Sequence, residues 1–435
     1  MSGTERRLKN LMTLLEQARE RLGLDLGFVL WEGSTVPAGL PRDALALHIA
    51  DKGAVARLIR SPKLETLLLL WLVRRIDVRN GTLFDLVHLR KTKSTRDFRK
   101  TLDKRLALRT LLAFLFAPRG AALPALRQSK WRPSSGDPSE NKRNISYHYN
   151  LSNTFYSLWL DKEMVYTCAY CTDWDNDIDR MQQDKLEMIC RKLRLKAGER
   201  MLDIGCGWGA VSMFAARHYG VTAYGVTLSE QQVAYANEKI KRLGLQDRVR
   251  IECKDYTQVE GEGAFDKIAA IGIQEHIGIA NYPTYYKTIN RLLKRDGLFL
   301  HHAITWPAKR PDSALRRGGP ADIHIFTKYI FPGAQLDNIG NAMRMLERHG
   351  FEVHDVEAWR EHYQRTCRLW HDRLLANYDA AAAEIGDLKA RLWLTYLAAS
   401  SIAFERNSIG LYQTLASKRR RGPSGLPPTR ADLYR

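Results

Sequence analysis

The stretch MLDIGCGWG, residues 201–209, decides the fold of this chain. Its first four residues are typical of a buried strand, and Gly205, Gly207 and Gly209 then lead into a helical pattern over 210–218. Such glycines allow a tight turn and let the backbone approach a ligand at the N-terminus of a helix. A dinucleotide fingerprint is G-x-G-x-x-G, but this spacing is tighter. The carboxylate of Asp203 would repel a pyrophosphate, whereas it suits the amino group of a cationic ligand.

Strands and helices alternate outward from this motif. Expected strands follow at 221–226, 249–253, 265–271 and 298–304, with helices over 230–242 and 282–293. This alternation predicts an α/β fold, a Rossmann-like, doubly wound parallel sheet. Two further strands are expected at 351–356 and 411–415, and the roughly 50 residues between them have a helical pattern. We expect this insertion to cap the ligand-binding edge of the sheet; the alternative is extra helical core.

Composition excludes several protein classes. The chain has 435 residues, of which 45% are hydrophobic and 27% charged, so it is neither disordered nor collagen-like. The apolar runs 67–73 and 111–117 are about a third of the length needed to cross a bilayer. The N-terminus is polar and lacks a secretory pattern. Six scattered cysteines favour a reducing, cytoplasmic location.

The net charge of +20 is unevenly distributed. Residues 1–145 carry 28 Lys/Arg against 14 Asp/Glu, residues 418–435 carry six against one, and residues 146–417 are close to neutral. A protein that binds nucleic acid at its active site usually makes that site basic. We therefore predict no nucleic-acid partner, and instead a peripheral contact with an anionic lipid surface.

The glycine turn preceded by an acid resembles the first motif of class I S-adenosylmethionine methyltransferases. In that fold the ligand lies outside the carboxyl ends of the strands, where polar residues follow each predicted strand. Thr227 and Gln232 would lie near the ribose, Asp255 near the adenine amino group and Tyr256 against the ring. The alternative for the motif is an ordinary glycine turn.

Longer motifs resemble the cyclopropane-fatty-acid synthases and their mycolic-acid relatives. The resemblance covers roughly residues 145–417, and a weaker similarity extends over residues 28–90. The motifs that carry it are Tyr147-His148-Tyr149-Asn150, Asn153-x-Phe155-Tyr156, Trp159-Leu160-Asp161, Met164-x-Tyr166-Thr167-Cys168-Ala169-Tyr170, LDIGCGWG, Thr227-Leu228-Ser229-x-x-Gln232, Glu275-His276-x-Gly278, Lys328-Tyr329-Ile330-Phe331-Pro332-Gly333 and Tyr363.

This resemblance implies a reaction. The methyl group of S-adenosylmethionine is transferred to a cis alkene in a fatty-acyl chain, and loss of a proton then closes a cyclopropane ring. The implied base is a bound bicarbonate rather than a side chain. Its implied holders are Cys168, Glu275, His302, the backbone at Ile304, and Tyr363. The implied cofactor contacts are Tyr166, Thr167, Gly205, Gly207, Thr227, Gln232, Asp255 and Tyr256.

Simpler structural roles remain open for these residues. His302 lies on an apolar strand and could be a core histidine, Glu275 could cap a helix, and Tyr363 could be helix packing. Cys168 with Cys171 spells C-x-x-C, but no second pair exists, so we predict no metal site.

The chain also departs from the family pattern. Asn150, Ser152 and Cys171 replace more common residues, and Ser400 replaces a cysteine often found in the capping helix. These changes leave a methyl- or methylene-branched product as the alternative to the ring.

The sequence predicts four regions. They are a smaller N-terminal α+β lipid-binding domain (1–127), a linker (128–145), the catalytic domain (146–417) and a disordered basic tail (418–435). Residues 90–105 carry eight basic residues beside an apolar helical stretch, which suits the inner face of a membrane. An RNA or small-molecule methyltransferase and a non-catalytic lipid-binding protein are the competing functions. The oligomeric state is open, with a homodimer as one candidate.

Overall fold

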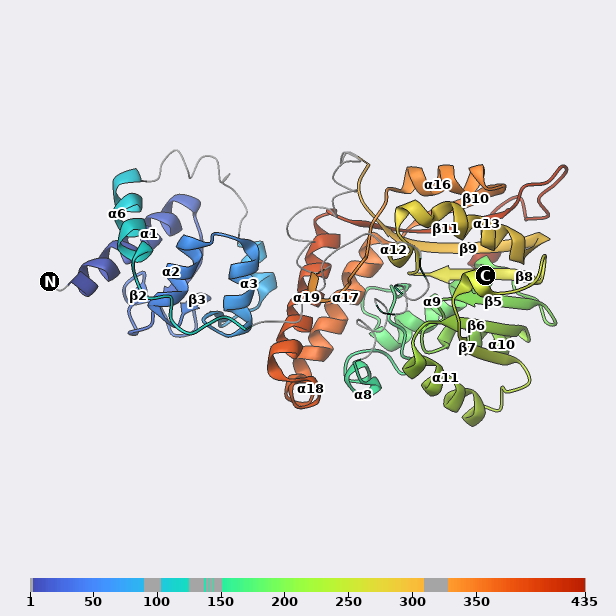
Figure 1. Cartoon of the computed structure of the whole chain (residues 1–435), viewed down its shortest axis with the longest axis horizontal. Coiled ribbons are helices and arrows are strands. Elements are labelled where there is room, and N and C mark those ends of the chain that lie inside the picture. The colour runs from blue at the N-terminus through green and yellow to red at the C-terminus, as the bar shows by residue number, and fades with distance from the viewer. Residues whose placement is uncertain are drawn as a thin grey trace. The chain divides into compact units, whose positions relative to one another are not determined.

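The structure is a computed structural model, and it describes residues 3–89, 103–124, 137, 140, 143, 151–308 and 328–434. The chain divides into two compact units, Met1–Arg127 and Gln128–Arg435 (Figure 1). Three features of the sequence analysis lie outside the described residues: the basic residues 90–100, most of the linker, and the motif at 147–150.

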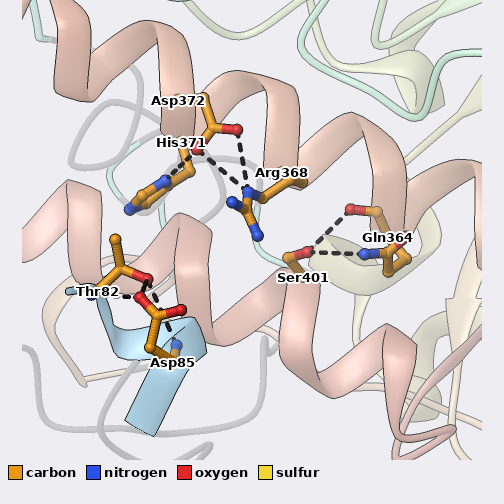
Figure 2. A network of polar contacts seen from close by, with 7 residues as sticks. All are labelled: Thr82, Asp85, Gln364, Arg368, His371, Asp372 and Ser401. Atoms are coloured by element: carbon orange, nitrogen blue, oxygen red, sulfur yellow. Dashed lines mark hydrogen bonds and ion pairs between the residues drawn. The ribbon is translucent and has the colours of Figure 1, made fainter. Parts of the chain in front are cut away.

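The first unit packs helices around a small sheet with the strand order β2-β1-β3-β4. Strands β1 and β3 are parallel, whereas the two outer pairs are antiparallel. Helix α4 begins with a capping box, in which the Thr82 and Asp85 side chains each accept a hydrogen bond from the other's backbone N–H (Figure 2). The elements are α1 (Gly3–Leu22), β1 (Gly27–Val29), β2 (Thr35–Val36), β3 (Ala46–Ile49), α2 (Lys52–Arg60), α3 (Leu64–Leu72), β4 (Ile76–Arg79), α4 (Leu83–His88) and α6 (Lys104–Leu115).

The second unit is built on a seven-stranded sheet with the order β10-β11-β9-β8-β5-β6-β7. The predicted α/β class is confirmed. The elements are α8 (Asn153–Ser157), α9 (Ile178–Lys192), β5 (Arg200–Ile204), α10 (Ala210–Tyr219), β6 (Thr222–Thr227), α11 (Glu230–Arg242), β7 (Val249–Cys253), η1 (Tyr256–Gln258), β8 (Phe265–Ile271), α12 (Gln274–Ile277), η2 (Ile279–Asn281), α13 (Tyr282–Leu292), β9 (Leu293–Thr305), α16 (Ile339–Arg348), β10 (Phe351–Ala358), α17 (Arg360–Ala376), α18 (Tyr378–Ile385), α19 (Asp387–Glu405), β11 (Gly410–Lys418) and η3 (Ala431–Leu433).

Helices cover both faces of this sheet, as expected for a doubly wound fold. Apolar side chains of α9 and α10 pack against β5, β8 and β9 on one face. Those of α13 pack against the same strands on the other face. These three strands therefore bury both of their faces, which explains why they read as nearly continuous apolar runs in the sequence.

One strand departs from the predicted parallel arrangement, since β11 runs antiparallel to both β9 and β10. The chain leaves β10 at Ala358, forms the helices α17 to α19, and returns so that Tyr412 pairs with Ala358. Because the helices begin and end beside the carboxyl end of β10, the returning strand β11 must run in the direction opposite to β10. Periodicity reports burial and carries no information about strand direction, so the sequence could not reveal this.

Helices α17, α18 and α19, here called the cap helices, form the insertion between β10 and β11. In Figure 2, Ser401 of α19 and Gln364 of α17 face each other. The Ser401 hydroxyl donates to the Gln364 carbonyl oxygen at 2.9 Å, which ties the two long helices together. One turn further along α17, the Arg368 guanidinium pairs with Asp372 at 3.0 Å.

The C-terminal segment, predicted to be a disordered tail, is ordered where the structure describes it. Asp432 pairs with Arg194 at 2.8 Å, and the side chain of Leu433 in η3 is buried. A basic, Pro-rich composition suggested disorder, but the buried Leu433 and the ion pairs of Asp432, Arg430 and Arg420 dock this segment on the second unit.

No helix in the described part of the chain combines the length and the apolar character needed to cross a membrane.

Candidate active site

The glycine turn after β5 is shaped by two close contacts and one open position. All three glycines have positive φ, at +72°, +56° and +84° along the chain. A Cβ on Gly205 would lie 2.2 Å from Ile273, and one on Gly209 would lie 2.4 Å from Ile251, whereas nothing lies within 4 Å of that position at Gly207. Packing therefore requires two of the glycines, and Gly207 faces space that a ligand could fill.

Asp203, at the end of β5, is buried and directed toward the start of α10. Its carboxylate accepts a hydrogen bond from the Ser212 hydroxyl at 2.9 Å. Burial raises its pKa to about 6, although the Ser212 hydrogen bond and the Lys185 ammonium favour the charged form. The predicted contact of Asp203 with a ligand amino group stays a prediction, because one carboxylate oxygen already has a protein partner.

The predicted ribose and adenine residues lie at the carboxyl ends of β6 and β7. The Thr227 hydroxyl donates to the Gln232 side-chain oxygen at 2.7 Å, and both residues are buried. One oxygen of Asp255 accepts hydrogen bonds from the Thr257 backbone N–H and hydroxyl at 2.9 and 2.6 Å, so its other oxygen remains for a ligand. The neighbouring Tyr256 is partly buried. The fold thus brings these predicted cofactor residues to the same sheet edge as the glycine turn.

The segment between α8 and α9 carries Tyr166, Thr167 and Cys168 without regular secondary structure. Helix α9 holds this segment: the Gln182 side-chain amide donates to the Thr167 carbonyl at 2.9 Å, and the Lys185 ammonium donates to the Thr167 hydroxyl at 2.8 Å. The backbone and the hydroxyl of Thr167, the middle one of these three residues, are therefore held from one helix.

An aromatic cluster surrounds Tyr166. Its ring lies 5.2 Å from Trp159, 5.3 Å from Trp370 and 6.1 Å from Trp393, measured between centroids. Tyr156 joins the cluster and also meets Trp208 of the glycine turn at 5.0 Å. These residues come from α8, the irregular segment, the glycine turn and the cap helices α17 and α19. The cap helices therefore pack beside the ligand-binding edge of the sheet, as the sequence predicted.

A second wall of the candidate site, here called the opposite wall and defined by Glu275 and His302, begins with Glu275 of α12, which follows β8. One oxygen of Glu275 accepts a hydrogen bond from the Ile304 backbone N–H at 2.6 Å. The other oxygen is buried and has no hydrogen-bond partner among the residues described. Burial raises the pKa of this carboxyl to about 7, so near neutral pH a large fraction of it is protonated.

His302 and Cys168 approach this wall around Trp359. The His302 ring packs edge-on against Trp359 at 5.5 Å, and the Cys168 sulfur lies 3.9 Å from the Trp359 carbonyl oxygen. Within the described ranges neither ring nitrogen of His302 has a partner. Burial lowers the pKa of His302, assisted by Lys185, so the imidazole is neutral. Tyr363 lies one turn further along α17.

Comparison with known proteins places this geometry in a family. A sequence profile described as mycolic acid cyclopropane synthetase matches residues 137–414. The chain belongs to this family. A "probable fatty acid methyltransferase" of Pseudomonas putida is 40% identical over 302 residues, covering 69% of this chain and 76% of that one. The cyclopropane-fatty-acyl-phospholipid synthase of Escherichia coli is 37% identical over 271 residues, covering 62% and 66%.

A solved structure of a family member supports the fold and the cofactor. The mycolic acid cyclopropane synthase CmaA1, crystallised with S-adenosylhomocysteine and CTAB, aligns with a TM-score of 0.59 and 30% identity. The alignment covers 64% of this chain and 98% of that one. The chain is an S-adenosylmethionine-dependent methyltransferase, which excludes the non-catalytic alternative.

Sequence reasoning missed a polar network behind Glu275. The preceding Gln274 donates to the Tyr282 hydroxyl at 2.7 Å and accepts from the Tyr286 hydroxyl at 3.3 Å and from His301. These residues are all buried and belong to three different elements. The sequence gives no sign of such a network, because a tyrosine on the buried face of a helix looks like ordinary core.

Proposed function

We propose that this enzyme transfers the methyl group of S-adenosylmethionine to the double bond of an unsaturated acyl chain in a membrane phospholipid and closes a cyclopropane ring. The observation that carries the proposal is the buried wall formed by Glu275 and His302. One Glu275 oxygen and both His302 nitrogens are buried there without a hydrogen-bond partner among the described residues, and the His302 ring packs against Trp359. Such a site suits a hydrocarbon that brings no polar groups of its own but must lose a proton.

S-adenosylmethionine, when bound, supplies a methyl group on a cationic sulfur. Around it, Gly207 leaves room for the ligand, Thr227 and Gln232 adjoin the ribose, and Asp255 accepts from the adenine amino group. Tyr166 and Thr167 contact the amino-acid end. The open position at Gly207 and the free oxygen of Asp255 support this assignment.

An alkene is a weak nucleophile and has no proton whose removal would activate it. The protein must therefore hold the alkene against the methyl group and exclude water. The positive charge that develops on the acyl chain is stabilised by aromatic faces. Tyr166 and its tryptophan neighbours present such faces beside the predicted cofactor contacts.

The residues of the opposite wall fit a small oxyanion such as bicarbonate. The protonated form of Glu275 can donate a hydrogen bond from its unpaired oxygen, and neutral His302 can donate from one nitrogen. Cys168 and Tyr363 complete the predicted set, whereas the Ile304 N–H already donates to Glu275. When bound, bicarbonate supplies a base in a wall that otherwise contains a largely protonated acid and a weakly basic imidazole.

Methyl- or methylene-branching of the acyl chain is the second candidate. The name of the Pseudomonas putida relative and the departures at Ser152, Cys171 and Ser400 favour it. The reactions share the methyl transfer and differ in how the resulting cation loses a proton. Loss from the new methyl group with ring closure gives the cyclopropane, and loss from a neighbouring chain carbon leaves a methyl-branched alkene. A hydride shift to the cationic carbon, followed by proton loss from the methyl group, gives a methylene branch.

The first unit offers a surface for the lipid bilayer. Leu108, Leu111 and Leu112 of α6 and the following Phe116 are exposed, and they lie at helical spacing. Arg109 lies on the same helix and is also exposed. An apolar stripe beside basic residues suits an anionic membrane surface. The cytoplasmic location and a homodimer stay predictions.

Two substitutions test this surface. The double variant Leu108→Asp/Leu112→Asp should reduce co-sedimentation with anionic vesicles about tenfold or more, because each buried leucine contributes on the order of 1–2 kcal/mol. Leu243→Asp, at the exposed leucine that follows α11 in the second unit, is the control. Unchanged vesicle binding in the α6 variant would remove the surface from the account.

The reaction itself is tested with radiolabelled S-adenosylmethionine and phospholipid vesicles. We expect label in the extracted lipid with unsaturated acyl chains and none with saturated chains. Label in RNA, or in the saturated lipid, would contradict the proposal.

A further inference from the structure

Lys185 is a charged residue in an unusual environment. It lies on the buried face of α9 with an exposed fraction of 0%. Among the described residues its nitrogen forms no ion pair, and its one hydrogen bond goes to the Thr167 hydroxyl at 2.8 Å. Burying an ammonium with a single neutral partner costs folding free energy, which points to a local function for Lys185.

The chemistry of this hydrogen bond fixes its direction. A lysine ammonium has three donors and no acceptor, so the Thr167 oxygen must accept. The hydroxyl hydrogen of Thr167 is then directed away from Lys185. No described residue accepts it, and Thr167 is only partly buried. The hydrogen is therefore available to a ligand.

Two further contacts hold Thr167 in place. Gln182, one turn before Lys185 on α9, donates to the Thr167 carbonyl at 2.9 Å. On the other side the Thr167 methyl group lies so near Gly272 that a Cβ there would be 3.1 Å from it. These contacts fix the backbone and the methyl group of Thr167. The hydrogen bond from Lys185 then fixes the one remaining torsion, the direction of the hydroxyl hydrogen.

The carboxylates nearest to Lys185 are already partly satisfied. Asp203 accepts from Ser212 at 2.9 Å, and Asp161 accepts from the backbone N–H groups of Glu163 and Val165 at 2.9 and 2.8 Å. Both act on Lys185 only at longer range. They compensate its charge without replacing the Thr167 oxygen as the hydrogen-bond acceptor of the ammonium.

We propose that Lys185 is a positioning residue that orients the Thr167 hydroxyl as a hydrogen-bond donor to the carboxylate of the cofactor's methionine moiety. The proposal rests on the assignment of Thr167 as a cofactor contact in the proposed function. Lys185 itself acts through Thr167 and does not touch the reacting atoms.

Calorimetry on the full chain with two ligands tests it. S-adenosylhomocysteine carries the carboxylate, whereas 5′-methylthioadenosine lacks the whole amino-acid end. Lys185→Met and Thr167→Val should each weaken S-adenosylhomocysteine binding about tenfold and leave methylthioadenosine binding within about twofold. The double variant should lose no more than either single variant, because both remove the same interaction.

A matched control separates this role from general damage to α9. Lys192 is an equally buried ammonium of the same helix, but it pairs with Glu357 and with Gln413 at 2.7 Å. Lys192→Met should leave the ratio of the two affinities unchanged. Equal losses for both ligands in Lys185→Met, additive losses in the double variant, or an unchanged S-adenosylhomocysteine affinity would each overturn the proposal.

If Lys185→Met does not fold, Thr167→Val and Thr167→Ser carry the test. Serine keeps the hydroxyl and should retain the wild-type ratio of affinities, whereas valine should lose it. An unchanged ratio in Thr167→Val overturns the proposal. These readouts concern cofactor binding alone, so failure of the proposed function would appear separately, as intact binding without label in lipid.

Discussion

The two walls of the candidate site differ in how their polar atoms are satisfied. On the cofactor wall, Asp203, Thr227 and Asp255 each form a hydrogen bond within the chain. On the catalytic wall, one oxygen of Glu275 and both nitrogens of His302 are buried without a partner among the described residues.

This difference has an energetic meaning. An unpaired buried polar atom costs about 1–3 kcal/mol. A chain that leaves several in one wall therefore pays for an arrangement completed by a ligand. We infer that the proposed cofactor wall is preorganised before binding, whereas the proposed catalytic wall is completed by what binds there.

The largest expected effect comes from Glu275→Gln. The amide keeps the size of the side chain but cannot hold or release a proton, so turnover should fall by about a hundredfold or more. Binding of S-adenosylhomocysteine should stay within a few-fold, because Glu275 belongs to the other wall. Steady-state kinetics and calorimetry on the same preparation measure both. A loss of cofactor affinity by orders of magnitude would contradict the separation of the walls.

The same variant should change the pH dependence of stability. Burial raises the pKa of Glu275 from 4.5 to about 7, so the folded chain binds this proton more tightly than the unfolded chain. The wild type therefore loses stability as pH rises from 4.5 to 7, by on the order of 2–3 kcal/mol from this group.

Urea unfolding below and above that window measures the effect. Relative to the wild type, Glu275→Gln should gain stability as pH rises. Asp161 and Asp203, whose pKa values burial also raises, cancel in the comparison because both proteins contain them. A constant difference at all pH values would show that the folded and the unfolded chain bind this proton equally tightly. Glu275 would then be charged in the folded protein near neutral pH, and burial would not have removed it from water.

The smallest expected effect concerns Gly207. An alanine there meets no neighbour, but its positive φ of +56° costs about 1 kcal/mol of stability. Gly244, with φ of +66° and equally open surroundings, provides the matched control. Both alanine variants should lose similar stability, and only Gly207→Ala should also weaken S-adenosylhomocysteine binding, by about tenfold. Equal cofactor affinity in the two variants would show that the ligand does not approach Gly207.

The contrast between the walls also explains what could be predicted from the sequence. Elements such as 230–242, 249–253 and 265–271 are found at the predicted residues, because the periodicity of their apolar residues is strong. The cofactor residues follow these strands directly and so carry a local signal. Glu275, His302 and Cys168 come from separate elements, and only the resemblance to a family linked them.

Other features had no signal in the sequence. The reversed direction of β11 depends on where the cap helices return, and the docking of η3 depends on the buried Leu433 and on the ion pair of Asp432 with Arg194. Lys185 resembles a surface lysine in a charged helix, and only its burial reveals it. Such features arise from contacts between distant segments, which periodicity and composition do not record.

The central claim is tested most directly by the structure of the lipid product. Vesicles of a phospholipid with one cis double bond, incubated with the full chain and S-adenosylmethionine, should yield an acyl chain heavier by one CH₂. Proton NMR of that chain should show loss of the olefinic signals and appearance of the upfield cyclopropane signals. An acyl chain of unchanged mass, with the methyl group on a head group or on no lipid at all, would contradict the account.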